Sequence, residues 1–143
     1  MLREIAPLCG TGGGLLIGID LQKDVATIEA AYNDNRGVTA EFNLNLLHRI
    51  NRELGGDFNV DQFEHVAHYN KRLGRVESYL VSQTDQLVSL DGECFPFDEG
   101  EAICTEYSHK YTIDGFAAMA AEVGLTLRRA WTDGGLSPLS CAT

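Results

Sequence analysis

The sequence predicts a mixed α/β fold that consists of one structural unit with an inserted antiparallel sheet. Residues 15–21 form a continuous apolar run that follows four glycines among residues 10–14. Such a run is typical of a buried parallel strand that is entered through a tight loop. From residue 61 onward, short runs rich in Val, Phe, Tyr and Thr indicate antiparallel strands instead. The 143 residues are enough for one domain with a modest core.

A long helix is expected after the first strand. Thr39 is a typical N-cap residue, and Gly55 with Gly56 can end a helix. Between them, apolar residues recur at helical spacing, at Phe42, Leu46 or Leu47, Ile50 and Leu54. This stripe predicts that one face of the helix packs on a sheet.

Turn signals interrupt the strand-rich segment at residues 70–74, 91–92 and 98–100. Asn, Asp and Gly at such breaks are typical of β-hairpins. The segment is therefore predicted to form an antiparallel β-meander.

A second helix and a further strand are expected after the meander. Thr112 can cap this helix and Gly124 can end it. Its shared apolar face would contain Phe116, Met119 or Ala120, and Val123. Residues 125–131 then have the pattern of another strand.

The chain is acidic, with a formal net charge of −10. Binding to nucleic acid or to an anionic membrane requires clustered Lys and Arg, which the sequence lacks. It also shows no secretory signal and no apolar stretch that approaches the ~20 residues of a membrane span. We therefore expect a cytoplasmic protein.

The cysteines show no metal-binding pattern. There is no C-x-x-C pair, so reduced thiols and no metal site are expected. A disulfide between Cys94 and Cys104 across a hairpin is an alternative. His65 and His68 are three residues apart in a predicted strand and should face opposite sides, which argues against a zinc site.

The glycines among residues 10–14 do not fit a phosphate-binding loop. The last position of G-x-G-x-x-G falls on Leu15, and no G-K-[ST] occurs. The glycines also precede the predicted strand, so they do not lead from a strand into a helix N-terminus. We expect this loop to reverse the chain direction.

The candidate functional residues lie in segment 104–111. Side chains two apart in a strand point the same way, so Glu106 and Ser108 should share a face. A carboxylate and a hydroxyl so placed can hold the two nitrogens of an imidazole. The alternative is two solvated polar residues on an exposed strand, since polar alternation is normal there.

Several other segments occur in a fixed order around this pair. They are GGGLLIGIDLQKD (12–24), AYND (31–34), GVTAEFN (37–43), TEYSHK (105–110) and WTD (131–133). Together they closely resemble the histidine-specific Nα-methyltransferases of ergothioneine biosynthesis. The resemblance spans roughly residues 8–133 and covers only the C-terminal half of that family's chain.

The resemblance implies an α/β (α+β) chain, the C-terminal part of a doubly wound methyltransferase core with an inserted antiparallel β-meander as substrate domain. Residues 1–56 would be the end of the core, 57–111 the substrate-binding sheet, 112–133 a helix and strand that return to the core, and 134–143 an irregular tail. It also implies that the S-adenosylmethionine site lies before Met1, so no cofactor is expected to bind this chain alone.

The resemblance further implies that Glu106 and Ser108 fix the imidazole of L-histidine and that Tyr32 hydrogen-bonds its carboxylate. The implied reaction moves methyl groups from S-adenosylmethionine to the α-amine until trimethylhistidine forms. Such a reaction asks the protein chiefly for orientation, so no residue is assigned as catalytic.

Two alternatives stay open. The chain could be a non-catalytic remnant or a histidine- or imidazole-binding module, because Pro138 stands where the family's last strand needs a hydrogen-bond donor. It could also belong to a relative that methylates another small amine. If the chain is a methyltransferase core cut before its fifth strand and lacking its last strand, apolar strand edges at residues 15–19 and 125–130 would lack neighbours, so a self-associated dimer is expected.

Overall fold

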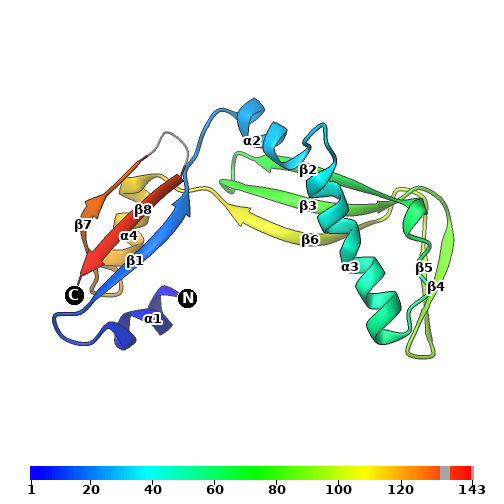
Figure 1. Ribbon diagram of the computed structural model, residues 1–143, viewed down its shortest axis with the longest axis horizontal. Helices are drawn as coiled ribbons and strands as arrows, with labels where there is room; N and C mark the ends of the chain where they lie inside the picture. Colours follow the sequence, from blue (N-terminus) through cyan, green and yellow to red (C-terminus); the bar gives the residue numbers. More distant parts are fainter. Residues whose placement is uncertain (133–135, 143) are drawn as a thin grey trace. The chain divides into compact units, whose positions relative to one another are not determined.

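The computed structural model describes residues 1–132 and 136–142 of the chain. The chain forms two compact units (Figure 1), unit 1 from Met1–Lys23 with His109–Thr143 and unit 2 from Asp24–Ser108. Both units contain helices and antiparallel strand pairs, so the fold is mixed α/β. None of the described helices is both long and apolar enough to cross a lipid bilayer.

Unit 1 contains a three-stranded sheet of order β1-β8-β7. Strands β1 (Gly14–Asp20) and β7 (Thr126–Ala130) each pair antiparallel with β8 (Leu136–Ala142), so β1 and β7 run parallel to each other. We expected β1 to be a buried parallel strand, but its ladder is antiparallel, and Ile19 is its one buried residue. The continuous apolar run predicted burial of both faces of the strand, but the side chain of Leu16 is 71% exposed.

The expectation of an irregular tail at residues 134–143 differs from the structure, in which β8 is the central strand of this sheet. Pro138 lies opposite Gly18 of β1, whereas the described ladder with β7 ends at the pair Ala130↔Leu139. Pro138 therefore has a ladder neighbour on one side alone among the described residues. A proline is tolerated where one side of a strand needs no donor.

Two helices cover this sheet. α1 (Leu2–Cys9) was not anticipated, whereas α4 (Ile113–Ala121) lies where the second helix was predicted. Thr112 caps α4 as expected, since its Oγ1 accepts a hydrogen bond from the Gly115 N–H at 3.0 Å. One buried cluster of unit 1 contains Leu2 from α1, Ile19 from β1 and Phe116 from α4, and a second contains Ala120 and Leu125.

An ion pair joins the end of β1 to the segment that precedes α4. The Lys110 ammonium, whose side chain is 1% exposed, lies 2.8 Å from Asp20 Oδ2. Partial burial raises the pKa of Asp20, but hydrogen bonds and charge attraction from Lys110 and Lys23 outweigh it and hold this pKa below its ordinary value. The neighbouring backbone is tied as well, through a parallel bridge between Leu21 and Tyr111.

Unit 2 contains two helices and two sheets. The helices are α2 (Val25–Tyr32) and α3 (Val38–Leu54), followed by the short 3₁₀ helix η1 (Val60–Gln62). The strands are β2 (Phe63–Asn70), β3 (Arg75–Ser82), β4 (Gln86–Leu90), β5 (Glu93–Phe97) and β6 (Ala102–His109). Both helices belong to unit 2 together with these strands, although residues 1–56 were expected to belong to the methyltransferase core.

The strands of unit 2 do not form one continuous meander. β2, β3 and β6 form a three-stranded sheet in that order, and β4 with β5 forms a separate hairpin. The hairpin turn at residues 91–92 is as predicted, with positive φ at Asp91 (51°) and Gly92 (79°). Local turn signals place hairpins but do not say which strands become neighbours across a sheet.

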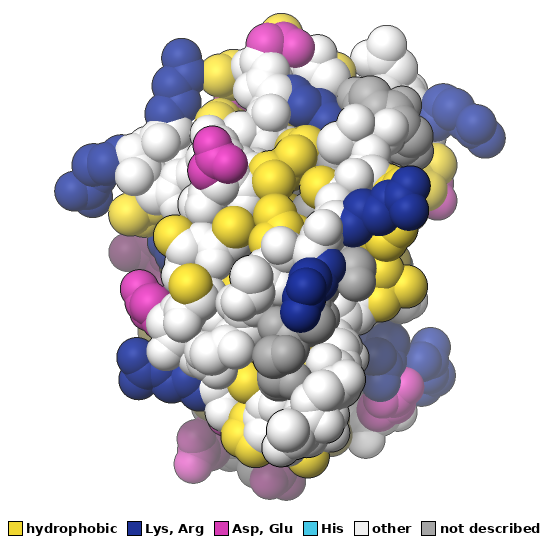
Figure 2. All heavy atoms as spheres, turned by 90° about the vertical axis from the view of Figure 1, so that its left-hand side faces the viewer, with side chains coloured by type: hydrophobic (Ala, Val, Ile, Leu, Met, Phe, Trp, Pro, Cys, Tyr) yellow, Lys and Arg dark blue, Asp and Glu magenta, His cyan; other side chains and the backbone are white. Residues whose placement is uncertain are grey.

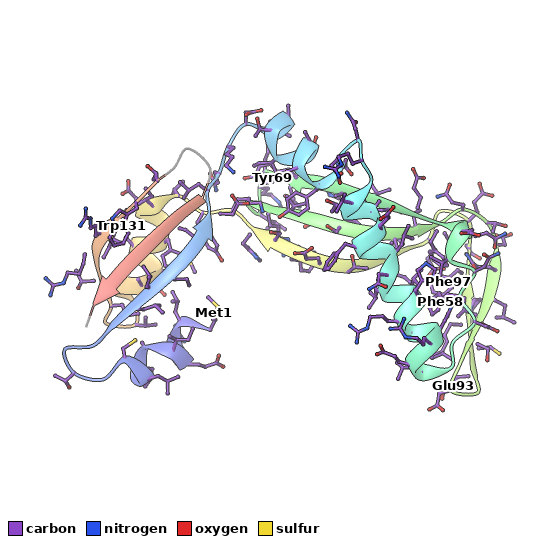
Figure 3. All side chains as sticks on the ribbon, viewed as in Figure 1. Met1, Phe58, Tyr69, Glu93, Phe97 and Trp131 are labelled. Carbon is purple, nitrogen blue, oxygen red and sulfur yellow. The ribbon has the colours of Figure 1, made fainter. Side chains whose placement is uncertain are left out.

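α3 packs one face on this sheet. Leu47 of α3, Phe63 of β2 and Leu80 of β3 are buried together. Phe58 and Phe97 extend this cluster towards the β4–β5 hairpin (Figure 3), with ring centroids 6.1 Å apart. The predicted C-terminal end of the helix is confirmed, with Gly55 as C-cap at φ 67°.

The predicted N-cap of α3 is wrong, because Gly37 and not Thr39 occupies that position. The Asp34 carboxylate instead accepts hydrogen bonds from the N–H groups of Val38 and Thr39, at 3.2 and 2.9 Å. The side chain that satisfies these helix-end donors therefore comes from outside the helix.

Candidate functional site

Strand β6 carries Glu106 to the edge of a hollow beside helix α3. The α3–β6 hollow has a volume of about 370 Å³, and its lining residues are Phe42, Asn43, Asn45, Leu46, Arg49, Thr105 and Glu106. Thr105 and Glu106 are adjacent in sequence yet both line it, so the simple alternation of faces along β6 shifts at this point. Such a shift re-aims side chains in a strand.

Ser108 lies two residues further along β6 and meets helix α2. The hydroxyl of Tyr32, the last residue of α2, donates a hydrogen bond to Ser108 Oγ at 2.7 Å. The structure brings Tyr32 and Ser108 into direct contact, and it places Glu106 on the hollow.

The end of α2 is held on β2 by side-chain hydrogen bonds. Asn33 forms a two-point contact with the backbone of Ala67, with Nδ2 donating to its carbonyl at 2.9 Å and Oδ1 accepting its N–H at 3.3 Å. The His65 ring lies beside it, with Nε2 3.0 Å from the Tyr32 carbonyl and Nδ1 2.9 Å from Asn43 Nδ2. Tyr32 therefore stands on an anchored helix end.

The opposite face of the same sheet carries a charged cluster that the sequence did not reveal. The buried Glu77 carboxylate accepts hydrogen bonds from Tyr79 at 2.9 Å and from Arg75 at 2.8 Å. These two bonds hold the pKa of Glu77 below its ordinary value, and the bond with Glu77 raises the pKa of Tyr79 to about 12. His68 stacks on Tyr79, which places it on this face, opposite to His65 as expected.

Arg75 also covers the ring of Tyr107, with its Cζ 3.6 Å from the ring centroid. A hydrogen bond with Cys104 raises the pKa of Tyr107. Arg75 and Glu77 are two residues apart on a strand, so their spacing indicates a shared face. Their partners on β6 could not be predicted in this way, because they depend on the order of the strands in the sheet.

Among the described residues, Cys9, Cys94 and Cys104 are free thiols. The disulfide alternative between Cys94 and Cys104 is therefore not formed. The described part of the chain also contains no group of three or more His, Cys, Asp or Glu side chains arranged to hold a metal ion.

Comparison with known proteins adds to this geometry. The family model of histidine-specific, S-adenosylmethionine-dependent methyltransferases matches residues 1–137. The histidine N-alpha-methyltransferase of Mycolicibacterium smegmatis is 43% identical over 135 residues, which cover 92% of this chain and 42% of that protein.

More distant relatives carry related names. Ergothioneine biosynthesis protein 1 of Neurospora crassa is 31% identical over 139 residues, which cover 93% of this chain and 15% of that protein. The L-tryptophan methyltransferase of Psilocybe serbica is 29% identical over 126 residues, which cover 85% of this chain and 35% of that protein. The chain spans less than half the length of each of these relatives.

Proposed function

Since the chain belongs to the family of histidine-specific, S-adenosylmethionine-dependent methyltransferases, we propose that it is the substrate-binding portion of an L-histidine Nα-methyltransferase. The trimethylhistidine that such an enzyme makes would serve ergothioneine synthesis. One observation carries the proposal in this chain, which is that β6 presents Glu106 at the α3–β6 hollow and, two residues further along, Ser108 to Tyr32.

The proposed imidazole contacts follow from the chemistry of these groups. The Glu106 carboxylate can accept one ring N–H in a charge-assisted hydrogen bond, and Ser108 meets the other ring nitrogen. Phe42 and Leu46 give the hollow an apolar wall against which a planar ring can pack. An apolar wall with few polar groups is the usual make-up of a site for a small molecule.

Tyr32 is the proposed ligand of the substrate carboxylate. Its hydroxyl lies 2.7 Å from Ser108 Oγ, so the proposed carboxylate and imidazole contacts are neighbours. One amino acid the size of histidine can span such adjacent contacts. The share of this chain in the chemistry is to hold the α-amine in a fixed orientation, which is the main demand of methyl transfer from an activated donor.

The residues of this chain do not fit an S-adenosylmethionine site. The glycine segment joins α1 to β1, and a Cβ at Gly13 would lie 1.8 Å from the Cys9 carbonyl oxygen, so the loop serves a close backbone turn. No strand–glycine loop–helix unit occurs among the described residues. We therefore expect the cofactor to bind elsewhere in the full protein and not to this chain alone.

We also propose that the sheet of unit 1 is the end of a doubly wound methyltransferase core. Strands β1 and β7 are parallel to each other, and the chain between them passes through α4. A strand, a helix and a parallel strand are the repeating elements of such cores. The antiparallel β8 lies between these two strands.

Two other functions are alternatives to this proposal. A binding module for histidine or imidazole would use the same residues without the chemistry. A methyltransferase for a different amine is supported by the name of the Psilocybe serbica relative, which acts on L-tryptophan.

Calorimetric titration of the 143-residue chain with L-histidine, L-tryptophan and glycine tests the proposal. We expect saturable binding of L-histidine at millimolar concentration or tighter, weaker binding of L-tryptophan and none of glycine, which lacks a side chain. Equal affinity for L-tryptophan would favour the other-amine function. No saturation with L-histidine would contradict the assignment of its binding site to these residues.

A further inference from the structure

Tyr32 is fixed at both its ends. Its hydroxyl donates to Ser108 Oγ at 2.7 Å, and its backbone carbonyl lies 3.0 Å from His65 Nε2. Because Tyr32 is the last residue of α2, its carbonyl lies among the last four of the helix, which find no partner within it. The His65 ring supplies a donor to that carbonyl.

The hydrogen-bond partners determine the tautomer of His65. A carbonyl oxygen only accepts, so Nε2 carries the hydrogen that faces Tyr32. In the neutral ring Nδ1 is then an acceptor, and Asn43 Nδ2 donates to it at 2.9 Å. Asn43 Nδ2 also donates to the Tyr79 carbonyl at 3.2 Å, which fixes the orientation of the amide.

These contacts connect the sheet to Tyr32 through Asn43 and His65. Asn43 is only 8% exposed, and the Tyr79 carbonyl to which it donates belongs to β3. α2 has eight residues, and a helix of that length is marginal without tertiary contacts. The Asn33 contact with Ala67 holds the neighbouring residue, and the His65 ring contacts the Tyr32 carbonyl itself.

We propose that His65 is a positioning residue, held by Asn43 as the Nε2–H tautomer, and that it sets the place of the Tyr32 hydroxyl at the substrate carboxylate. This inference rests on the proposed function, because it takes Tyr32 as the carboxylate ligand. His65 itself touches no substrate. Its effect on binding passes through Tyr32.

A double-mutant cycle tests this path. L-Histidine affinity is measured by calorimetry for the 143-residue chain and its variants His65→Leu, Tyr32→Phe and the double variant. We expect each single substitution to weaken binding about tenfold and the double variant to bind no more weakly than Tyr32→Phe. Asn43→Leu, which keeps the ring but removes the donor to Nδ1, should give a smaller loss that also vanishes in the Tyr32→Phe background.

Two further variants separate positioning from general damage. His65→Gln keeps an N–H donor of similar reach and should restore affinity to within about threefold of the unchanged chain. His68→Leu removes a histidine from the opposite face of β2 and should leave affinity unchanged. Ring ¹⁵N NMR should show His65 protonated at Nε2 and unprotonated at Nδ1.

These outcomes distinguish the positioning role of His65 from the proposed function. If Tyr32→Phe weakens binding but His65→Leu does not, or if their losses multiply in the double variant, the positioning role is overturned while the proposed function stands. A Nδ1–H tautomer would also overturn it. If Tyr32→Phe binds L-histidine like the unchanged chain, the assignment of Tyr32 in the proposed function fails, and the positioning role fails with it.

Discussion

At the scale of single residues, we propose that Glu106 gives the site its selectivity. Its carboxylate lines the α3–β6 hollow, where it can accept an imidazole N–H. A charge-assisted hydrogen bond of this kind contributes about 1.5–3 kcal/mol, whereas one between neutral partners, as at Ser108, contributes about 0.5–1.5 kcal/mol. The order of these two magnitudes leads to a test.

Glu106→Ala should weaken L-histidine binding by about ten- to a hundredfold, and Ser108→Ala should weaken it less. Isothermal calorimetry measures both. Glu64→Ala, which removes an exposed carboxylate from β2 of the same sheet, is the matched control and should have no effect. Indistinguishable affinities for Glu106→Ala and the unchanged chain would rule out the imidazole contact.

The Asp20–Lys110 pair predicts a pH dependence of stability. The folded-state pKa of Asp20 lies below the ordinary value of 3.8. Its stabilising contribution is therefore complete above about pH 4 and is lost as the pH falls through the lower folded-state pKa. In urea unfolding, the free energy of unfolding should fall in this acid range, and Asp20→Asn should reduce that fall.

At neutral pH, Asp20→Asn should also lower the free energy of unfolding, because it takes the charged partner from a lysine whose side chain is 1% exposed. A third of the Asp20 side chain is exposed, so we expect about 1–2 kcal/mol, less than for a fully buried pair. If Asp20→Asn had the same free energy of unfolding as the unchanged chain both at neutral pH and in the acid range, solvent would screen this pair.

Part of the site could be predicted from local spacing and part could not. That Glu106 and Ser108 lie close together on one strand follows from its period of two, although the shift at Thr105 was not visible in the sequence. The contact of Asn43 with His65 joins residues 22 positions apart on a helix and a strand. No periodicity encodes such a pairing, since it depends on how α3 crosses the sheet.

At the scale of elements, capping and turn chemistry were informative because they act within a few residues. The cap at Thr112, the stop at Gly55 and the turn at residues 91–92 are each determined locally. Strand orientation and neighbourhood are not. This is why β1 was assigned parallel neighbours and why β8, with its proline, was missed.

The cap of α4 provides a test at this scale. Thr112→Ala removes the acceptor of the Gly115 N–H and should lower the free energy of unfolding by about 1 kcal/mol. Thr112→Ser retains a side-chain oxygen and should restore most of the loss. Urea unfolding of the three proteins measures both changes. If Thr112→Ala were as stable as Thr112→Ser, the cap would contribute nothing.

At the scale of the whole molecule, unit 1 exposes several large apolar side chains. Figure 2 shows hydrophobic side chains interspersed with Lys and Arg on this side of the molecule. Among the residues of this unit whose burial is described, the exposed large apolar ones are Met1, Leu8, Leu16, Met119 and Trp131. β1 has one ladder partner in the described sheet order and therefore lies at its edge. Although β8 supplies a strand that we expected to be missing, self-association through β1 stays a prediction.

Light scattering at micromolar concentration should therefore give a mass above that of one 15.7 kDa chain. Leu16→Ser, on β1, should shift the mass towards the monomer. Leu87→Ser removes a similarly exposed leucine, 64% against 71%, from the β4–β5 hairpin and should not. A monomer with cooperative unfolding would show that the exposed apolar surface needs no partner.

The central claim, that this chain selects L-histidine for Nα-methylation, is tested most directly by methyl transfer. The chain can be joined to the amino-terminal part of the Mycolicibacterium smegmatis relative and supplied with S-adenosylmethionine and either L-histidine or L-tryptophan. We expect methylated histidine by mass spectrometry, little methylated tryptophan, and a kcat/KM for L-histidine that falls about ten- to a hundredfold in Glu106→Ala. A fused protein that folds and binds the cofactor but methylates L-tryptophan as well as L-histidine, or histidine equally well without Glu106, would contradict the account.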